Sequence, residues 1–413
     1  MSEQVRVEMD VIGRNALVGE AYFHVARSQI STTFKYADEF LGSRQAYSID
    51  PQLPLSVAPI SVPGLPGAFS DSAPDRWGRN LVAKQHRRQV AQGDARDRRL
   101  TEVDYLLGVS DLTRQGALRF RRSSTAEYLS AGASVPKTVS LPELQHAADE
   151  AAEGTGAAIK RLLEAGTGSL GGARPKASVA GGSGGLMIAK FTRPGDDWNV
   201  ILWERLALEV ARSSGVAVPH AQLVRIDERP VLLLDRFDRQ HGRRIGYMSS
   251  MTAADRRDGE HADYVDIVEA IEDTSSRWRR DCSELFRRMA LSSALHNTDD
   301  HLRNHGFLRH EAGWELSPAF DINPEPDLAV ERQTAINGVT EAEHEAEALL
   351  EFAPLCHLTT TEARTILAEV AEAVGHWEEC ANALSVPSRE LTSVGDAINT
   401  QLERLRAVLP AAL

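Results

Sequence analysis

The sequence HNTDDHLRNHGFL, residues 296–308, follows an apolar helical stretch and holds three histidines, two aspartates and two asparagines. Asp299 and Asn304 are five positions apart, which is the D-x-x-x-x-N spacing of a kinase catalytic loop. In such a loop the aspartate orients and deprotonates the attacking hydroxyl group, and the asparagine holds a magnesium ion. The spacing therefore predicts a phosphoryl-transfer site in this stretch.

Two other interpretations of the same residues are open. His301 and His305 are four positions apart and would share one face of a helix, so together with His296 and with Asp299 or Asp300 they could bind zinc or form a metal-dependent phosphohydrolase site. The glycine and the apolar residues that follow indicate a loop and a strand, which weakens this zinc interpretation. The third interpretation is a polar turn whose side chains cap a helix.

A second magnesium ligand is expected after a short hairpin. Residues 306–308 and 314–316 read as two strands, with Glu311-Ala312-Gly313 as the turn. Asp321 follows in SPAFDINP, seventeen positions after Asn304. Because magnesium prefers oxygen ligands, Asn304 and Asp321 are the predicted metal ligands.

A lysine and a glutamate precede this region in the order that a kinase requires. Lys190 lies at the end of the apolar strand predicted at 186–191, and Glu204 comes fourteen positions later in the helix predicted at 200–213. Protein kinases use a strand lysine to hold phosphates and pair it with a helix glutamate. Alternatively, Lys190 reaches solvent from the end of its strand.

A glycine-rich stretch, GTGSLGG at 166–172, comes before the lysine. Glycines allow backbone N–H groups to approach a phosphate closely, but many such stretches are ordinary turns. The stretch does not match GxxxxGK[ST], nor GxGxxG followed by a helix. Each feature alone is weak, whereas loop, lysine, glutamate, Asp/Asn pair and final aspartate occur together in the kinase order.

Composition limits the class of protein. The net charge of −13 over 413 residues argues against bulk attraction to nucleic acid. The three scattered cysteines show no metal-binding spacing and are expected to be reduced thiols. The N-terminal sequence lacks the apolar core of a signal peptide, and the longest apolar runs are too short to span a bilayer. We therefore expect a cytoplasmic protein with no membrane partner.

The chain reads as a mixed α/β half followed by an α-rich half. The Arg-rich stretch 86–122 is expected to be partly helical, with arginines that pair with acidic residues of the same stretch; contact with DNA is the alternative. Periodicity predicts strands at 5–12, 186–191 and 230–237, and helices at 141–164, 200–213, 283–295, 360–383 and 389–409.

At these residues the sequence resembles the HipA family of serine/threonine kinases, the toxin components of type II toxin–antitoxin systems. The resemblance extends over nearly the whole chain. It is carried by NTDDHLRNHGFL and GWELSPAFDINP (residues 297–308 and 313–324), GLPGAFSDSAPDRWGR and VSDLTRQGALRF (64–79 and 109–120), SLGGARPK (169–176) and LLLDRFDR (232–239).

The resemblance implies an α+β, bilobal, protein-kinase-like fold. A mixed α/β N-terminal lobe with an added N-terminal subdomain would precede an all-α C-terminal lobe. The implied boundaries are 1–125 for the N-terminal subdomain, 126–245 for the region with the phosphate loop, and 246–413 for the helical lobe with the catalytic and metal-binding loops.

The resemblance also implies roles for individual residues. Asp299 is similar to the catalytic aspartate, Asn304 and Asp321 to the magnesium ligands, and Lys190 to the phosphate-binding lysine with Glu204 as its partner. His301 stands where many kinases have a lysine and would either contact the γ-phosphate or be structural. The remaining implied contacts to ATP are Ser169, Gly171 and Gly172 in the phosphate loop and the backbone from Asp235 to Phe237.

The implied activity is ATP- and Mg²⁺-dependent phosphorylation of a translation component, typically an aminoacyl-tRNA synthetase. Autophosphorylation of Ser169 would eject its loop and switch the kinase off. A HipB-like antitoxin would bind operator DNA, so that DNA is reached mainly through the antitoxin. Two departures from typical protein kinases are that no arginine precedes Asp299 and that DIN replaces DFG. A small-molecule kinase and a non-catalytic co-repressor remain as alternatives.

Overall fold

The computed structural model describes residues 2–410, apart from 12–13, 27–28, 124, 126, 129–135, 137–139, 154, 165–173, 183–184 and 194. The chain divides into two compact units. The first comprises Met1–Pro194 and Val224–Met248, and the second comprises Gly195–Leu223 and Ser249–Leu413. Within the described ranges, no helix is both long and apolar enough to cross a membrane.

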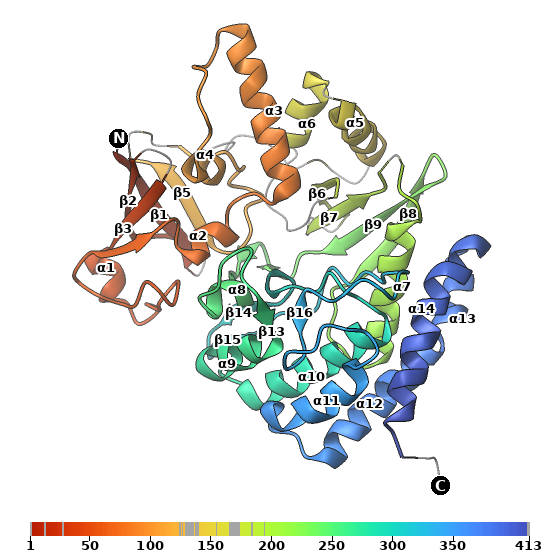
Figure 1. Cartoon of the computed structure of the whole chain (residues 1–413). Coiled ribbons are helices and arrows are strands. Elements are labelled where there is room, and N and C mark those ends of the chain that lie inside the picture. Colours follow the sequence, from red (N-terminus) through yellow and green to blue (C-terminus); the bar gives the residue numbers. More distant parts are fainter. Residues whose placement is uncertain are drawn as a thin grey trace. The chain divides into compact units, whose positions relative to one another are not determined.

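The first unit begins with a five-stranded antiparallel sheet, in the order β4-β3-β2-β1-β5 (Figure 1). Its first strand confirms the strand predicted at 5–12, because Val5, Val7 and Met9 alternate toward the core. The strands are β1 (Ser2–Val11), β2 (Arg14–Ala26), β3 (Gln29–Tyr36), β4 (Ile60–Pro63) and β5 (Leu118–Arg122), and the helices beside them are α1 (Asp38–Leu41), α2 (Gly67–Asp71) and α4 (Glu102–Leu107).

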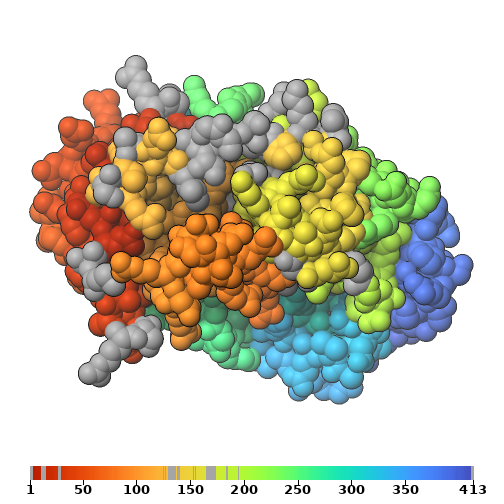
Figure 2. Space-filling model, turned by 90° about the horizontal axis from the view of Figure 1, so that it is seen from above, coloured from red at the N-terminus to blue at the C-terminus, as the bar shows by residue number. Residues whose placement is uncertain are grey.

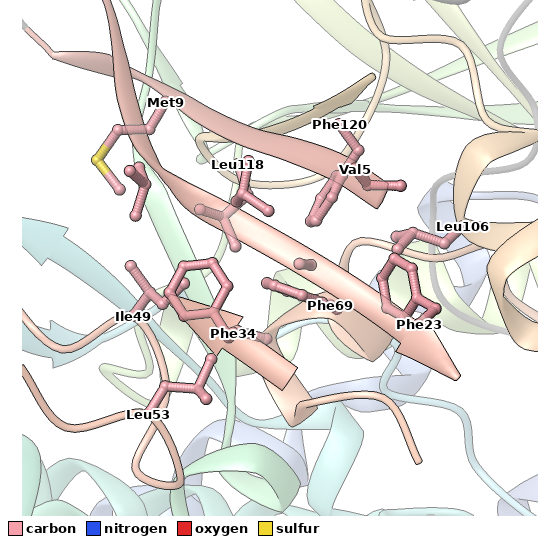
Figure 3. Close-up of a cluster of buried hydrophobic side chains, with 14 of the residues drawn as sticks. Val5, Met9, Phe23, Phe34, Ile49, Leu53, Phe69, Leu106, Leu118 and Phe120 are labelled. Atoms are coloured by element: carbon pink, nitrogen blue, oxygen red, sulfur yellow. The ribbon is translucent and has the colours of Figure 1, made fainter. Parts of the chain in front are cut away.

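Aromatic and aliphatic side chains form the core against this sheet (Figure 3). Phe69 of α2 meets Phe34, Phe120 and Phe23 edge to face, with ring centroids 5.9, 5.0 and 6.4 Å away. Aromatic rings prefer this geometry, which adds to the free energy gained by removing their surface from water. The core holds the short helix against the sheet although α2 has only five residues.

A second sheet of the first unit has the order β6-β7-β9-β8. Its strands are β6 (Lys176–Ala180), β7 (Leu186–Phe191), β8 (Ala221–Ile226) and β9 (Arg229–Asp235). Three short strands outside this sheet come next in the chain: β10 (Arg239–Gln240), β11 (Arg243–Arg244) and β12 (Gly246–Ser249). The strands predicted at 186–191 and 230–237 are confirmed. Residues 221–223 of β8 and Ser249 of β12 fall in the second unit.

Three helices accompany this sheet: α3 (Arg76–Gln92), α5 (Leu141–Glu153) and α6 (Gly156–Glu164). The single helix predicted at 141–164 is wrong, because α5 ends at Glu153 and α6 begins at Gly156; glycine is a poor helix former. The basic helix α3 packs against α6, and its atoms form the orange band in the space-filling view of Figure 2.

The second unit is mainly helical. A short antiparallel hairpin, β14 (Gly306–His310) and β15 (Gly313–Leu316), confirms the predicted hairpin, so the lobe expected to be all-α carries strands as well. The helices are α7 (Val200–Ser213), α8 (Ser250–Ala253), α9 (Tyr264–Thr274), α10 (Trp278–Ala294), α11 (Glu345–Phe352), α12 (Thr360–Gly375), α13 (Trp377–Ala383) and α14 (Ser388–Ala407).

Helix predictions in this unit are largely confirmed. The exception is 360–383, which forms α12 and α13, because α12 ends at Gly375. Parallel two-residue strands, β13 (Ala262–Asp263) and β16 (Thr334–Ala335), join distant parts of the unit. All three cysteines are free thiols, and burial raises the pKa of each of them, to about 12 for Cys282, so none is poised to react as a thiolate.

Candidate active site

The loop predicted to be catalytic begins where α10 ends. His296 follows this helix with a left-handed φ of 51°. Its ring Nε2 bonds the carbonyl oxygen of Asp327 at 3.0 Å, and its own carbonyl accepts from the Glu325 N–H at 2.9 Å. His296 is thus engaged with the segment that follows the hairpin, which is a structural use of a histidine rather than metal binding.

Asp299 and Asn304 lie on the same turn. Asp299 is exposed, whereas Asn304 is buried in the 3-10 turn η2 (Leu302–Asn304). The Asn304 Nδ2 donates to the carbonyl oxygen of Asp299 at 3.1 Å. Because the amide nitrogen makes this bond, the amide oxygen is the atom of Asn304 that suits a cation.

The segment with Asp321 returns to this loop. The backbone N–H of Asn323 donates to Asn297 Oδ1 at 3.3 Å. A cavity of about 20 Å³ is lined by Asn304 together with Phe320 and Ile322, the two neighbours of Asp321. Asp321 itself has a left-handed φ of 60°, which is uncommon outside glycine and is found often at functional sites.

These residues fit a magnesium ion better than zinc. An amide oxygen and a carboxylate are hard oxygen donors, and magnesium is often held by one or two protein carboxylates plus substrate phosphates. Among the described residues, no group of three His, Cys, Asp or Glu side chains could hold a metal ion. The interpretation based on His296, His301 and His305 therefore gains no support.

Asp300, next to the exposed Asp299, is buried. Its Oδ1 accepts from His305 Nε2 at 3.0 Å, and its Oδ2 accepts from the Tyr264 hydroxyl. Burial raises the pKa of Asp300, but His305, Tyr264 and Arg332 together outweigh burial and hold this pKa below its usual range. Asp300 is therefore an ionised, fully hydrogen-bonded anchor beneath the loop.

Arg332 connects Asp300, through the Tyr264 hydroxyl, to further buried residues of the second unit. Its Nη2 donates to the Tyr264 hydroxyl and to Ser292 Oγ at 3.1 Å each, and its Nη1 lies 2.8 Å from Glu345 Oε1. Gln401 Nε2 donates to Glu345 Oε2 at 3.2 Å. We call the connected side chains the Asp300 network, which comprises Tyr264, Ser292, Asp300, His305, Arg332, Glu345 and Gln401.

Gln333 makes contacts with the predicted catalytic loop that the sequence did not predict. Its Nε2 donates to Asp299 Oδ1 at 2.5 Å, and its backbone N–H donates to the Thr298 carbonyl at 2.9 Å. Gln333 and Asp299 are 34 positions apart in the chain, and no motif marks Gln333. No signal in the sequence could have found it, because the burial of Arg332, which fixes this segment, is visible only in the fold.

A pocket of about 440 Å³ opens beside the loop. His301 and Gln333 are among the residues that line it. The Gln333 side chain also bonds the exposed carboxylate of Asp299, so the pocket lies near that carboxylate. Its walls carry charge of both signs. The other lining residues are Met251, Arg256, Arg257, Asp258, Gly259, Glu260, His261, Ala262, Leu302 and Arg303.

In the first unit, two lysines face each other across strands. Lys190 of β7 is opposite Lys176 of β6, and both are at least nine-tenths buried. Lys176 pairs with Asp75 at 2.7 Å, and Asp75 also caps α3 by accepting from the Gly78 N–H at 2.6 Å. Sequence reasoning missed this Lys176–Asp75 pair. The alternative in which Lys190 reaches solvent from its strand end does not fit its burial.

The segment predicted to bind adenine is described as well. Asp235 ends β9 and is exposed, and the next backbone N–H, of Arg236, donates to the Leu186 carbonyl at 3.1 Å. The Phe237 ring lies 6.4 Å from that of Tyr247. No contact described at this segment assigns or excludes adenine, so its role stays a prediction.

The predicted phosphate loop and the predicted Lys190–Glu204 pair also stay predictions. Ser169, Gly171 and Gly172 lie outside the described residues. Glu204 is buried in α7 of the second unit, whereas Lys190 belongs to the first unit. Their predicted pairing therefore stays a prediction.

Comparison with known protein families shows which family this chain belongs to. A profile of the HipA-like C-terminal domain matches residues 168–377, and one of the HipA N-terminal domain matches residues 9–101. The chain belongs to the HipA family. The two matches follow each other in the order, N-terminal then C-terminal domain, that the sequence motifs indicate. No curated protein sequence matches the chain.

Among solved structures, a HipA from Shewanella oneidensis MR-1, determined with HipB and operator DNA, is similar over 98% of this chain and 97% of that one. The two share 14% sequence identity with a TM-score of 0.66, which shows a common HipA fold and confirms the predicted α+β class. The Helicobacter pylori proinflammatory kinase CtkA is 15% identical over 55% of this chain and 94% of that one, with a TM-score of 0.37.

Proposed function

We propose that this HipA-family chain is an ATP- and Mg²⁺-dependent serine/threonine protein kinase that acts as a HipA-like toxin. The observation that carries the proposal is the arrangement around Asp299. This carboxylate is exposed, Asn304 donates to the Asp299 carbonyl, and Asn304 lines one small cavity with the neighbours of Asp321. An exposed base and two oxygen ligands for a metal ion are what phosphoryl transfer to a hydroxyl group needs.

When bound, ATP would supply the γ-phosphoryl group and Mg²⁺ would offset its negative charge. Asn304 and Asp321 hold the metal in this proposal, and Lys190, paired with Glu204, holds the phosphates. Asp299 orients the acceptor hydroxyl and takes its proton. The acceptor oxygen forms a bond to the γ-phosphorus as the bond to the β–γ bridging oxygen breaks and ADP leaves.

Further residues complete the proposed nucleotide site. Ser169, Gly171 and Gly172 form the phosphate loop, the backbone of Asp235 and Phe237 holds adenine, and the exposed part of His301 contacts the γ-phosphate. Autophosphorylation at Ser169 would add about two negative charges beside the phosphates and so oppose ATP binding. Loss of all self-labelling in Ser169→Ala is expected; undiminished labelling would contradict this assignment.

The proposed target is a protein of translation, such as an aminoacyl-tRNA synthetase, phosphorylated in the cytoplasm. The pocket of about 440 Å³ beside Asp299 offers room for side chains that flank an acceptor residue. The S. oneidensis HipA was determined with HipB and operator DNA, so we propose a HipB-like antitoxin as partner here. The net charge of −13 fits DNA contact made mainly by such a partner.

The test uses Asp299→Asn, with Asp396→Asn, an exposed aspartate of α14, as the matched control. Wild type and control should transfer label from ATP to a protein band in a cell lysate, whereas Asp299→Asn should lose on the order of a thousandfold in rate. Label in a small molecule alone would favour a small-molecule kinase. Growth arrest that persists with Asp299→Asn would favour a non-catalytic co-repressor.

A further inference from the structure

Gln333 is fixed to the proposed catalytic loop at two points. Its backbone donates to Thr298 and its side chain donates to Asp299, with donor–acceptor distances of 2.9 and 2.5 Å. Both Gln333 and Asp299 are exposed, and an exposed carboxylate samples several rotamers unless a partner selects one. A hydrogen bond to an ionised group is strong enough to make that selection.

The neighbours of Gln333 in the chain are held rigidly. Arg332, on one side, is buried and bonds Tyr264, Ser292 and Glu345, and its Nε donates to the Thr334 carbonyl at 2.8 Å. Thr334, on the other side, is buried in β16 and pairs with β13. The Gln333 side chain therefore starts from a backbone that has little freedom.

The Asp300 network also holds the backbone next to Asp299, the other partner of the Gln333–Asp299 contact. Tyr264 receives a hydrogen bond from Arg332 and donates one to Asp300, the residue after Asp299. One set of buried side chains thus holds both Gln333 and Asp299 through residues adjacent to each in the chain. This arrangement fixes the two exposed side chains relative to each other.

We infer that Gln333 is a positioning residue that orients the Asp299 carboxylate, and that the Asp300 network holds the two in register. The inference rests on the proposed function. The Gln333 amide nitrogen is a donor that does not titrate, so it occupies Oδ1 without competing for the acceptor proton.

The first experiment measures transfer rate at saturating ATP, the KM for ATP and the melting temperature. Gln333→Ala should lower kcat by about tenfold to hundredfold with KM for ATP and melting temperature unchanged. Gln333→Glu is nearly isosteric but places a carboxylate against Asp299, so it should be slower than Gln333→Ala. Gln222→Ala, which removes another exposed glutamine of the second unit, should match wild type.

Equal losses in Gln333→Ala and Gln333→Glu, accompanied by a lower melting temperature, would show a merely structural role and overturn the inference. So would a wild-type rate in Gln333→Ala. Tyr264→Phe keeps the ring but removes the hydroxyl that joins Arg332 to Asp300, and should slow transfer several-fold. If the network acts through Gln333, Tyr264→Phe combined with Gln333→Ala should be no slower than Gln333→Ala alone.

The second experiment does not depend on kinase activity. Hydrogen–deuterium exchange of a peptide covering residues 296–305 should speed up in Gln333→Ala and stay at the wild-type rate in Gln222→Ala. Unchanged exchange in Gln333→Ala would overturn the inference, whether or not the chain transfers phosphate. Faster exchange in a protein without any transfer activity would support the positioning role and contradict the proposed function instead.

Discussion

Two buried networks of charged side chains, one from each unit, differ in charge balance and in what they reach. The Asp300 network of the second unit joins Arg332 to two carboxylates, Asp300 through a tyrosine hydroxyl and Glu345 directly. The network of the first unit, which we call the arginine cluster, holds five arginines but only two aspartates: Asp111, Arg114, Arg119, Arg236, Asp238, Arg239 and Arg244.

Backbone oxygens compensate for the missing carboxylates of the arginine cluster. Arg236 donates to the carbonyls of Thr113 and Arg114 at 2.5 and 3.3 Å, and Arg114 donates to that of Ser72 at 2.8 Å. Burial lowers the pKa of Arg114 and Arg239 to about 9, which leaves both charged at neutral pH. The cluster thereby joins residues 109–119 to residues 236–244, two parts of the first unit far apart in sequence.

The comparison shows that the amount of buried charge does not identify a functional network. The arginine cluster contains more ionised groups, but its described bonds lead to backbone groups, to its own two aspartates and, through Arg119, to the amide oxygen of Asn15. The Asp300 network contains fewer, yet Gln333 connects it to an exposed carboxylate. A network that ends at an exposed reactive group can position that group, whereas one that ends at backbone and amide groups stabilises the fold.

Among the substitutions that test this comparison, replacing Arg332 of the Asp300 network should lower the free energy of unfolding most. Arg332→Met leaves Glu345 buried without its ion-pair partner, so the free energy of unfolding should fall by about 3–5 kcal/mol. Chemical denaturation of the full chain, followed by hydrogen exchange of peptides from each unit, would locate the loss in the second unit. The variant with Glu345→Gln added should recover part of the loss, because no uncompensated charge remains; a worse double variant would contradict the argument.

Removing one aspartate of the arginine cluster should cost less and should depend on pH. Asp238 accepts from Arg236 at 2.8 and 2.5 Å and from the Gly116 N–H at 2.8 Å. Burial raises the pKa of Asp238, but the arginine charges outweigh it and hold this pKa below its usual range. Asp238→Asn should lower the free energy of unfolding at pH 7 by on the order of 2–3 kcal/mol.

The pH dependence of Asp238→Asn follows from the direction of the pKa shift. Below about pH 4 the unfolded chain binds the proton more readily than the folded chain, so the wild type loses the contribution of Asp238 as pH falls further. The melting temperatures of wild type and Asp238→Asn should therefore converge in acid. A constant difference from pH 7 to pH 3 would mean that the ionised carboxylate is not what stabilises the cluster.

The sequence was sufficient for features that depend on local pattern. Helix α7 and strand β7 have the predicted bounds, since apolar residues at helical or strand spacing determine such elements. The hairpin before Asp321 was also predicted from its turn. Helix interruptions at Gly156 and after Gly375 were missed, because a single glycine weakens a helix without necessarily ending it.

The residues that hold the candidate catalytic loop in place could not be predicted in this way. Gln333 and Arg332 reach the loop from another segment, and pairing between distant segments leaves no periodic signal in one sequence. Asp300 is one position off the D-x-x-x-x-N spacing and so received no role in the kinase interpretation. Only the folded chain shows its role, since Asp300 is buried and hydrogen-bonded whereas Asp299 is exposed.

Another bidentate pair, whose arginine is exposed, tests whether burial is what matters. Arg98 makes two hydrogen bonds to Asp104, at 2.6 Å each, much as Arg236 does to Asp238. The Arg98 side chain is 51% exposed, whereas that of Arg236 is 2% exposed. Water and salt therefore compete with the exposed pair and hardly reach the buried one.

Arg98→Ala should consequently have the smallest effect, about 0.2–1 kcal/mol at low salt and less at high salt. Asp104 keeps the Thr101 N–H and hydroxyl, each 2.8 Å from Oδ2, so the capping box of α4 survives the substitution. Denaturation at two salt concentrations measures the difference. A loss as large as that of Asp238→Asn would show that bidentate geometry, and not burial, sets the energy of these pairs, and the contrast between buried and exposed charge would fail.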